Sequence, residues 1–149
     1  MVKKANPYRY TIAVIALICL WITSNFNWQE DRSGRIIQTD GTGYYAYLPA
    51  IFIYNDLNFS FFDEVIDKNY HENNRYDYRS YFETYVINKY YAGTSLALLP
   101  FFLIAHIITH LAGYPADGYS YFYMIMISIA AVFYMAIGLV FLRKILLGM

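Results

Sequence analysis

Three long apolar runs constrain this chain of 149 residues more than any other feature. They cover about residues 8–28, 93–112 and 119–142. A helix of about 20 residues crosses the roughly 30 Å hydrocarbon core of a bilayer, so each run is long enough to span a membrane. The composition agrees: 58% of the residues are hydrophobic and only 15% are charged, which is unusual for a soluble domain. We expect an all-α polytopic membrane protein with about three transmembrane helices and a large outer loop containing interfacial helices.

The charges beside the apolar runs predict an orientation. Lys3, Lys4 and Arg9 precede the first run, and such cations stay on the cytoplasmic side. We therefore expect a multi-pass membrane protein with a cytoplasmic N-terminus. No small-x-small cleavage site follows the run, which favours an uncleaved helix over a signal peptide. Three full spans leave Arg143 and Lys144 outside, against the same rule, so either the rule fails for this pair or one run is re-entrant; we retain three spans.

The outer loop, about residues 29–88, contains most of the acids of the chain and many tyrosines and phenylalanines. A disordered linker is poor in aromatic residues, so we expect a folded or membrane-apposed loop. Its segment 44–54 is almost entirely apolar and aromatic, but a helix of this length spans only roughly 16 Å. It is therefore expected to lie on the membrane surface. Short helices are expected over 61–69, with Ser60 as N-cap, and over 80–88.

One carboxylate, Asp40, stands between a polar run and this interfacial segment. Gly41 and Gly43 follow it, and glycine readily adopts positive φ angles. We expect Asp40 to be presented on a tight, exposed turn rather than inside a helix. The alternative is that Asp40 only begins a turn before the interfacial segment.

Several functional classes lack support in the sequence. The net charge is zero and the charges are scattered, which argues against nucleic-acid binding. The only cysteine, Cys19, excludes an internal disulfide or a multi-cysteine metal site. His106 and His110 share a helix face, as two-histidine metal ligands do, but no Glu completes that pattern, so no metal site is predicted. Phosphate-binding loops, dinucleotide fingerprints and nucleophile elbows are absent from the sequence.

The remaining residues fit transfer of a group from a lipid phosphate. A carboxylate at the outer face can deprotonate an acceptor hydroxyl, and a nearby cation can hold the phosphate as its negative charge grows. The chain has an N-terminal helix, an acidic motif at Asp40, interfacial helices, and the segment Lys-Tyr-x-x-Gly at 89–93 followed by Pro100. This order resembles the N-terminal part of the GT-C superfamily of integral membrane glycosyltransferases, which includes protein O-mannosyltransferases and the lipid A aminoarabinose transferase.

The resemblance implies roles for individual residues. Asp40 would be the catalytic base or a base-positioning acid, and Lys89 would contact the lipid phosphate. Tyr44, Tyr45 and Tyr90 would complete the substrate site. The implied substrates are a polyprenyl-phosphate sugar and an acceptor hydroxyl of open identity. The implied surroundings are membrane lipid, in the bacterial inner membrane. No cofactor beyond the lipid donor is expected, and a divalent metal requirement stays open.

The chain also departs from the pattern of that family. Many relatives have an acidic pair where this chain has Asp40 and Gly41, and a proline pair where it has Tyr91 and Ala92. Family members have many more spans, so residues 1–149 are expected to be a module of a longer chain. The alternative function is a non-enzymatic small membrane protein whose aromatic outer loop binds partners, in which Lys89 is only a snorkelling interfacial cation.

Overall fold

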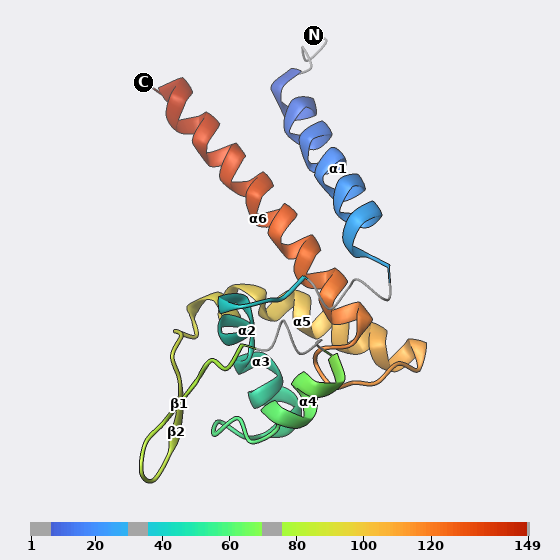
Figure 1. Ribbon diagram of the computed structural model, residues 1–149. Coiled ribbons are helices and arrows are strands. Elements are labelled where there is room, and N and C mark those ends of the chain that lie inside the picture. Colours follow the sequence, from blue (N-terminus) through green and yellow to red (C-terminus); the bar gives the residue numbers. More distant parts are fainter. Residues whose placement is uncertain (1–6, 30–35, 70–75, 149) are drawn as a thin grey trace.

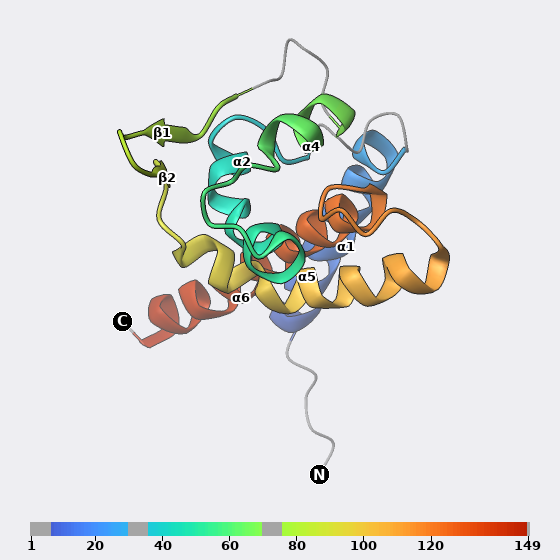
Figure 2. The same ribbon diagram turned by 90° about the horizontal axis from the view of Figure 1, so that it is seen from below.

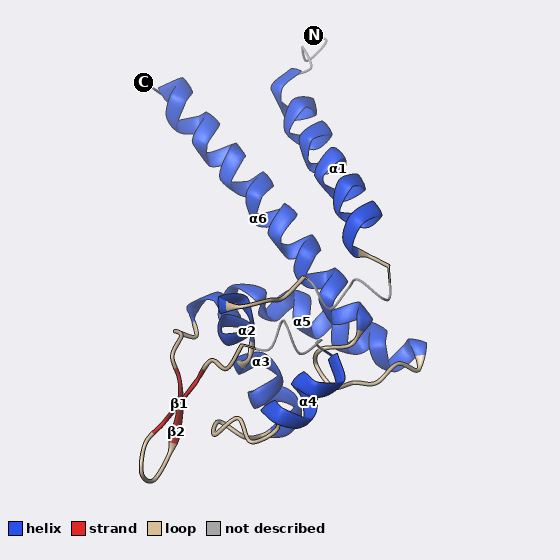
Figure 3. Cartoon of the chain, viewed as in Figure 1, coloured by secondary structure: helices blue, strands red, loops and turns tan. Residues whose placement is uncertain are grey.

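The computed structural model describes residues 7–29, 36–69 and 76–148 of the chain. It is mostly helical, with one short β-hairpin (Figure 3). The elements in chain order are α1 (Pro7–Asn27), α2 (Asp40–Tyr45), α3 (Tyr47–Pro49), the π-helix η2 (Ala50–Tyr54), α4 (Phe62–Asn69), β1 (Arg79–Tyr81), β2 (Val86–Asn88), α5 (Gly93–Ala112) and α6 (Tyr121–Gly148).

Helices α1, α5 and α6 are each long and apolar enough to cross a membrane. This confirms the predicted fold class. The bounds of α5 are those expected, and α1 is shifted by one residue from its expected range. Helix α6 continues to Gly148 instead of ending at Leu142, because Arg143 and Lys144 are good helix formers and their long side chains can reach water from within an apolar helix.

The molecule has two parts (Figures 1 and 2). Helices α1 and α6 run side by side, and the start of α1 and the end of α6 lie at the same end of the molecule. At the other end, α2 and α3 pack against α5, α4 lies farther from α5, and the hairpin projects away from it (Figures 1 and 2); we call α2, α3, η2, α4, α5 and the hairpin the loop body. Trp28, just after α1, joins α1 to α6 because its Nε1 donates to Ser128 Oγ at 2.8 Å, and its carbonyl accepts from the Tyr121 hydroxyl at 2.8 Å.

The core lies in the loop body and is largely aromatic. Its largest fully buried side chains include Tyr45, Tyr78, Tyr123, Phe59, Phe62 and Phe102. Most of these rings meet edge to face, as in the Phe62–Tyr78 pair at 5.1 Å and the Tyr45–Tyr119 pair at 5.5 Å. Such pairs add about 0.5–1.5 kcal/mol beyond the burial of their surface. The expectation of a folded aromatic loop is confirmed in the residues that the structure describes.

The loop before α6 closes this core through a glycine. The Tyr45 hydroxyl donates to the Gly118 carbonyl at 2.5 Å. Gly118 has a φ of +84°, and an added Cβ would lie 2.7 Å from the Cβ of Pro49. Both the backbone conformation and the close packing therefore require glycine here.

Residues 80–88 form a hairpin, so the helix expected there is wrong. Strands β1 and β2 pair antiparallel, with Tyr81 opposite Val86 and Ser80 opposite Ile87. Aromatic and β-branched residues favour strands, and their cross-strand contacts outweigh a short, isolated helical turn. The other short helix does form, as α4, and begins at Phe62.

The segment 44–54 is helical except at Ala46, and lies in the end of α2, in α3 and in η2. Tyr45, Leu48 and Ala50 are buried in the protein core, so these side chains contact protein. Ile51 and Phe52 are about half exposed. The placement of this segment on the membrane surface stays a prediction.

Candidate functional site

The hairpin that precedes Lys89 is anchored at its base by Arg79. The guanidinium of this buried side chain lies 4.0 Å from the centre of the Phe62 ring and contacts both carboxylate oxygens of Asp77 at 3.0 Å. Partial burial opposes ionisation of Asp77, but hydrogen bonds from the Arg79 side chain and backbone, and its positive charge, together lower the pKa of this carboxyl. Arg79 lies opposite Asn88 in the hairpin, so this contact holds the strand pair at the point where Lys89 follows.

Asp40 is the first residue of α2, not a turn residue, so the expected geometry of this segment is wrong. Gly41 and Gly43 are helical, and the positive φ falls instead on Thr39, at 49°. The physical reason is that a carboxylate in the first turn of a helix is stabilised by the unpaired N–H groups there. Asp40 remains exposed, as predicted.

Asp40 and Tyr90 are brought into direct contact although they are 50 residues apart. The Tyr90 hydroxyl donates to Asp40 Oδ1 at 2.5 Å and lies 2.7 Å from the Tyr76 hydroxyl. Since the Tyr90 proton is committed to the carboxylate, Tyr76 is the donor to Tyr90. The hydrogen bond to Asp40, then that to Tyr76, raises the pKa of Tyr90, which keeps its phenol neutral and able to donate.

The ring of Tyr90 is held in place from several sides. Tyr44 packs on it, with 4.6 Å between ring centres. Asn88 accepts from the Tyr90 backbone N–H at 3.0 Å and donates to the Gly43 carbonyl at 2.8 Å. Tyr47 donates its hydroxyl to the Tyr90 carbonyl at 2.7 Å.

Gly43 is needed at this point because a Cβ there would lie 2.2 Å from the Tyr90 ring and 2.9 Å from the Cβ of Tyr78. Its role is close approach rather than a special φ angle.

Lys89 lies next to this group of residues, which we call the Asp40 cluster: Asp40, Tyr44, Tyr76 and Tyr90. Its ammonium donates to the Asp77 carbonyl at 2.9 Å and lies 6.0 Å from the centre of the Tyr76 ring. Asp40 and Lys89 are therefore connected through two tyrosines. The Lys89 side chain is exposed, and an ammonium has three protons to donate.

Tyr45 is placed elsewhere. Its side chain is only 1% exposed, and its hydroxyl binds the Gly118 carbonyl within the core. Successive residues of a helix point about 100° apart, so Tyr44 and Tyr45 cannot both face Tyr90. The structure does not bring Tyr45 to the Asp40 cluster.

The two histidines do share a helix face. His106 and His110 place their Nε2 atoms 3.2 Å apart, and His106 Nδ1 lies 2.5 Å from the Tyr123 hydroxyl. In the part of the chain that the structure describes, no group of three or more His, Cys, Asp or Glu residues is close enough to hold a metal ion. The histidine contacts are explained by packing between α5 and α6.

Tyr76 and Asn88 were not among the residues that the sequence singled out. Tyr76 lies in a loop rich in tyrosines, and its spacing from Tyr90 has no helical or strand periodicity. Asn88 stands directly before Lys89 and offered a weak signal, because Asn often bonds the backbone two residues onward. Only the fold selects these two from the many aromatic and polar residues of the loop.

The Asp40 cluster thus combines an exposed carboxylate, phenol donors and a nearby ammonium at the edge of an aromatic core. The chemistry within its reach is proton abstraction by the carboxylate and anion binding by the lysine. Comparisons with protein-family models, with curated proteins and with solved structures gave no match, so the geometry of the cluster is the basis for assigning a function.

Proposed function

We propose that the chain is the N-terminal module of a membrane glycosyltransferase that moves a sugar from a polyprenyl-phosphate donor to an acceptor hydroxyl at the outer face. The proposal is supported chiefly by the Asp40 carboxylate, which is exposed and oriented by the Tyr90 hydroxyl at 2.5 Å. The Lys89 ammonium lies 6.0 Å from the ring of Tyr76, which in turn bonds Tyr90. The sequence order that resembles GT-C glycosyltransferases supports the same assignment.

In this mechanism the acceptor oxygen attacks the anomeric carbon of the sugar as the bond from that carbon to the phosphate oxygen breaks. Asp40 takes the acceptor proton, and Lys89 stabilises the negative charge on the departing lipid phosphate. Tyr90 occupies Oδ1 of Asp40, so we assign Oδ2 to the acceptor hydroxyl. Tyr76, which donates to Tyr90, is a positioning residue.

Two assays separate binding from chemistry. Binding of undecaprenyl phosphate is measured by its effect on thermal unfolding in detergent, and sugar transfer is measured in membranes supplied with polyprenyl-phosphate sugars. Asp40→Asn is expected to lower transfer by about 10²–10⁴-fold, the usual contribution of a general base, with lipid binding retained. Lys89→Met is expected to weaken lipid binding, because it removes the cation and keeps an apolar side chain of similar length.

Matched controls use charges of the same region or type. Glu83→Gln removes an exposed acid from the hairpin turn and should leave transfer unchanged, and Lys144→Gln removes a cation at the far end of α6. Folded protein that does not bind undecaprenyl phosphate, or Asp40→Asn with full transfer activity, would reject the proposal.

A second candidate, a membrane protein whose aromatic loop binds a partner, is favoured by one observation. The hairpin exposes Tyr81, Phe82, Tyr85 and Ile87, and Tyr91 beside it is 88% exposed. Phe82 and Tyr85 stack at 5.3 Å near the turn. Under this alternative, the double substitution Phe82→Ser and Tyr85→Ser abolishes cross-linking to a neighbouring protein, and Asp40→Asn has no effect on it.

A further inference from the structure

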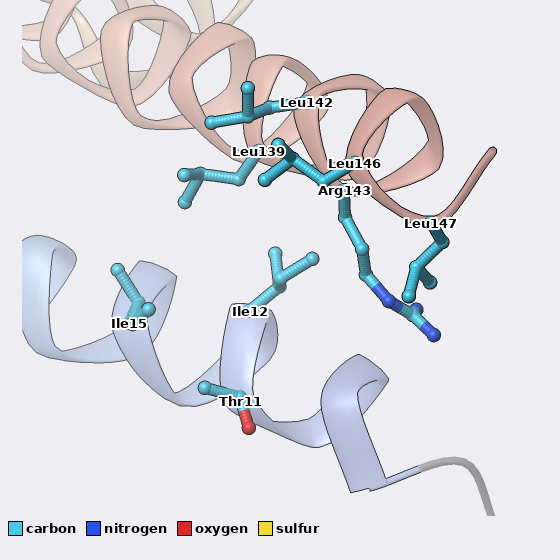
Figure 4. A pocket seen from close by; sticks show the side chains of 8 residues that line it. All are labelled: Thr11, Ile12, Ile15, Leu139, Leu142, Arg143, Leu146 and Leu147. Carbon is cyan, nitrogen blue, oxygen red and sulfur yellow. The ribbon is translucent and has the colours of Figure 1, made fainter. Parts of the chain in front are cut away.

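Helices α1 and α6 face each other at both ends of α1. At the terminal end, Thr11, Ile12 and Ile15 face α6 across an apolar groove of about 340 Å³ (Figure 4). The groove is lined from α6 by Leu139, Leu142, Arg143, Leu146 and Leu147. At the other end Trp28 binds Ser128. The paired stretches of about 21 residues each measure roughly 30 Å, which matches one hydrocarbon core.

Helix α5 meets α6 over a much shorter stretch. In the described residues, the hydrogen bonds and ring contacts between them fall between Tyr123 and Tyr134 of α6. His106 Nδ1 lies 2.5 Å from the Tyr123 hydroxyl, and Tyr134 donates to the Ala97 carbonyl at 2.6 Å. This part of α6 rises only roughly 16 Å, about half of a hydrocarbon core. This stretch ends at Tyr134, which is only about 9 Å along α6 from Ser128, where the contact with α1 begins.

The path of α5 agrees with these contacts. It passes across the lower part of α6, and both of its ends lie at the loop-body end of the molecule (Figures 1 and 2). A helix that crossed beside α1 and α6 would instead end near the N-terminus of α1.

The side of α5 that the protein leaves uncovered is largely apolar, with the exposed His110 at its edge. Its exposed large side chains are Leu96, Leu103, Ile104, Ile107 and Leu111. At 100° per residue these positions fall on one face. The opposite face, with Phe102 and Ala105, is buried in the core.

We infer that the chain crosses the membrane twice, through α1 and α6, and that α5 lies obliquely in the outer leaflet with its Leu and Ile face against lipid acyl chains. The loop between α5 and α6 is then on the outer side, and the start of α1 and the end of α6 share the other side. This inference does not depend on the proposed function.

The charges of the sequence fit two crossings better than three. Lys3, Lys4 and Arg9 precede or begin the first span, and Arg143 and Lys144 stand near the end of α6. With two crossings all five cations lie on one side, as the positive-inside rule requires. The conflict that three spans created disappears.

Single cysteines in a Cys19→Ala background test the topology. Spheroplasts expressing the chain are treated with a membrane-impermeant maleimide, and total labelling after lysis corrects for expression. Glu83→Cys, in the hairpin turn, is the outer control. We expect Ala116→Cys, between α5 and α6, to be labelled like the control, and Gly148→Cys to be labelled only after permeabilisation. Protection of Ala116→Cys, or labelling of Gly148→Cys in intact spheroplasts, overturns two crossings.

A quenching experiment tests the lipid contact separately. A fluorophore on Ile107→Cys is compared with the same fluorophore on Glu83→Cys in vesicles containing lipids with a nitroxide near the headgroup end of the chain. We expect loss of fluorescence at residue 107 and little at residue 83. Equal fluorescence at the two sites means that this face is covered by protein, by a second copy or a further segment, and overturns the lipid contact.

Discussion

Outside its hairpin, the loop body buries many of its aromatic side chains against one another, whereas α1 and α6 keep most of theirs on the outside. In α1 no residue of the apolar stretch Tyr10–Asn27 is buried, while Tyr45, Phe59 and Phe102 of the loop body are almost fully enclosed. Lipid is as apolar as these side chains, so exposed Leu and Ile residues in the two helices cost nothing within a bilayer. The loop body, in contrast, is stabilised by its own packing.

An exposed site in this chain can still be rigid. In the Asp40 cluster the carboxylate is exposed and the three tyrosines are half-buried, and the cluster is supported by the core through Gly43, Asn88 and Tyr47. A site on such a support keeps its geometry when side chains at the lipid surface change. Substitutions at core and lipid-facing positions should therefore differ sharply in their effect on stability.

The largest difference is expected within α5 itself. Phe102 is fully buried, and the centre of its ring lies 6.0 Å from that of Tyr45 and 5.3 Å from that of Tyr123. Phe102→Ala should lower the free energy of unfolding by about 3–5 kcal/mol, because it leaves a cavity. Leu103→Ala, one residue along on the exposed face, should change it by less than about 0.5 kcal/mol. Unfolding in detergent, followed by circular dichroism, measures both. Equal effects would mean that α5 is not packed on one face as described.

A smaller effect is expected where the core supports the Asp40 cluster. The added methyl group of Gly43→Ala would meet the Tyr90 ring at 2.2 Å, so Tyr90 must move away from Asp40. We expect a loss of about 1–3 kcal/mol in the free energy of unfolding, typical of overpacking. Gly41→Ala is the control, since its nearest neighbour is Ile37 at 3.9 Å. If the two variants melt at the same temperature, Tyr90 does not pack on Gly43.

The smallest effect concerns the acid dependence of the hairpin. The pKa of Asp77 is lowered in the folded chain, so its contribution to stability is present above its unfolded value of about 3.9 and is lost as the pH falls through the folded value. Asp77→Asn should make the hairpin more sensitive to proteolysis at neutral pH, and this difference from the unsubstituted chain should vanish in acid. Glu83→Gln is the control. A difference that persists unchanged at low pH would argue against the contact between Asp77 and Arg79.

Some features followed from the sequence because they depend on local composition. The positions of α1 and α5 were predicted to within one residue, since a run of about 20 apolar residues has few alternatives to a helix. The aromatic content of the outer loop predicted a folded region for a similar reason. The hairpin at 80–88 was missed because short segments of mixed propensity are decided by their neighbours, here by Arg79 packing on Phe62.

The residues of the Asp40 cluster, too, were only partly predictable from the sequence. The sequence by itself selected Asp40, Tyr44, Lys89 and Tyr90, from the residue types that lipid-phosphate chemistry needs and from a resemblance in their order. It could not separate Tyr45, which enters the core, from Tyr44, which faces Tyr90. Only the tertiary structure decided that Tyr76 joins the cluster and that Gly43 serves close packing rather than a turn, because these contacts connect residues 14 to 50 positions apart. Local pattern fixes which segments are helices, and long-range packing fixes which side chains meet.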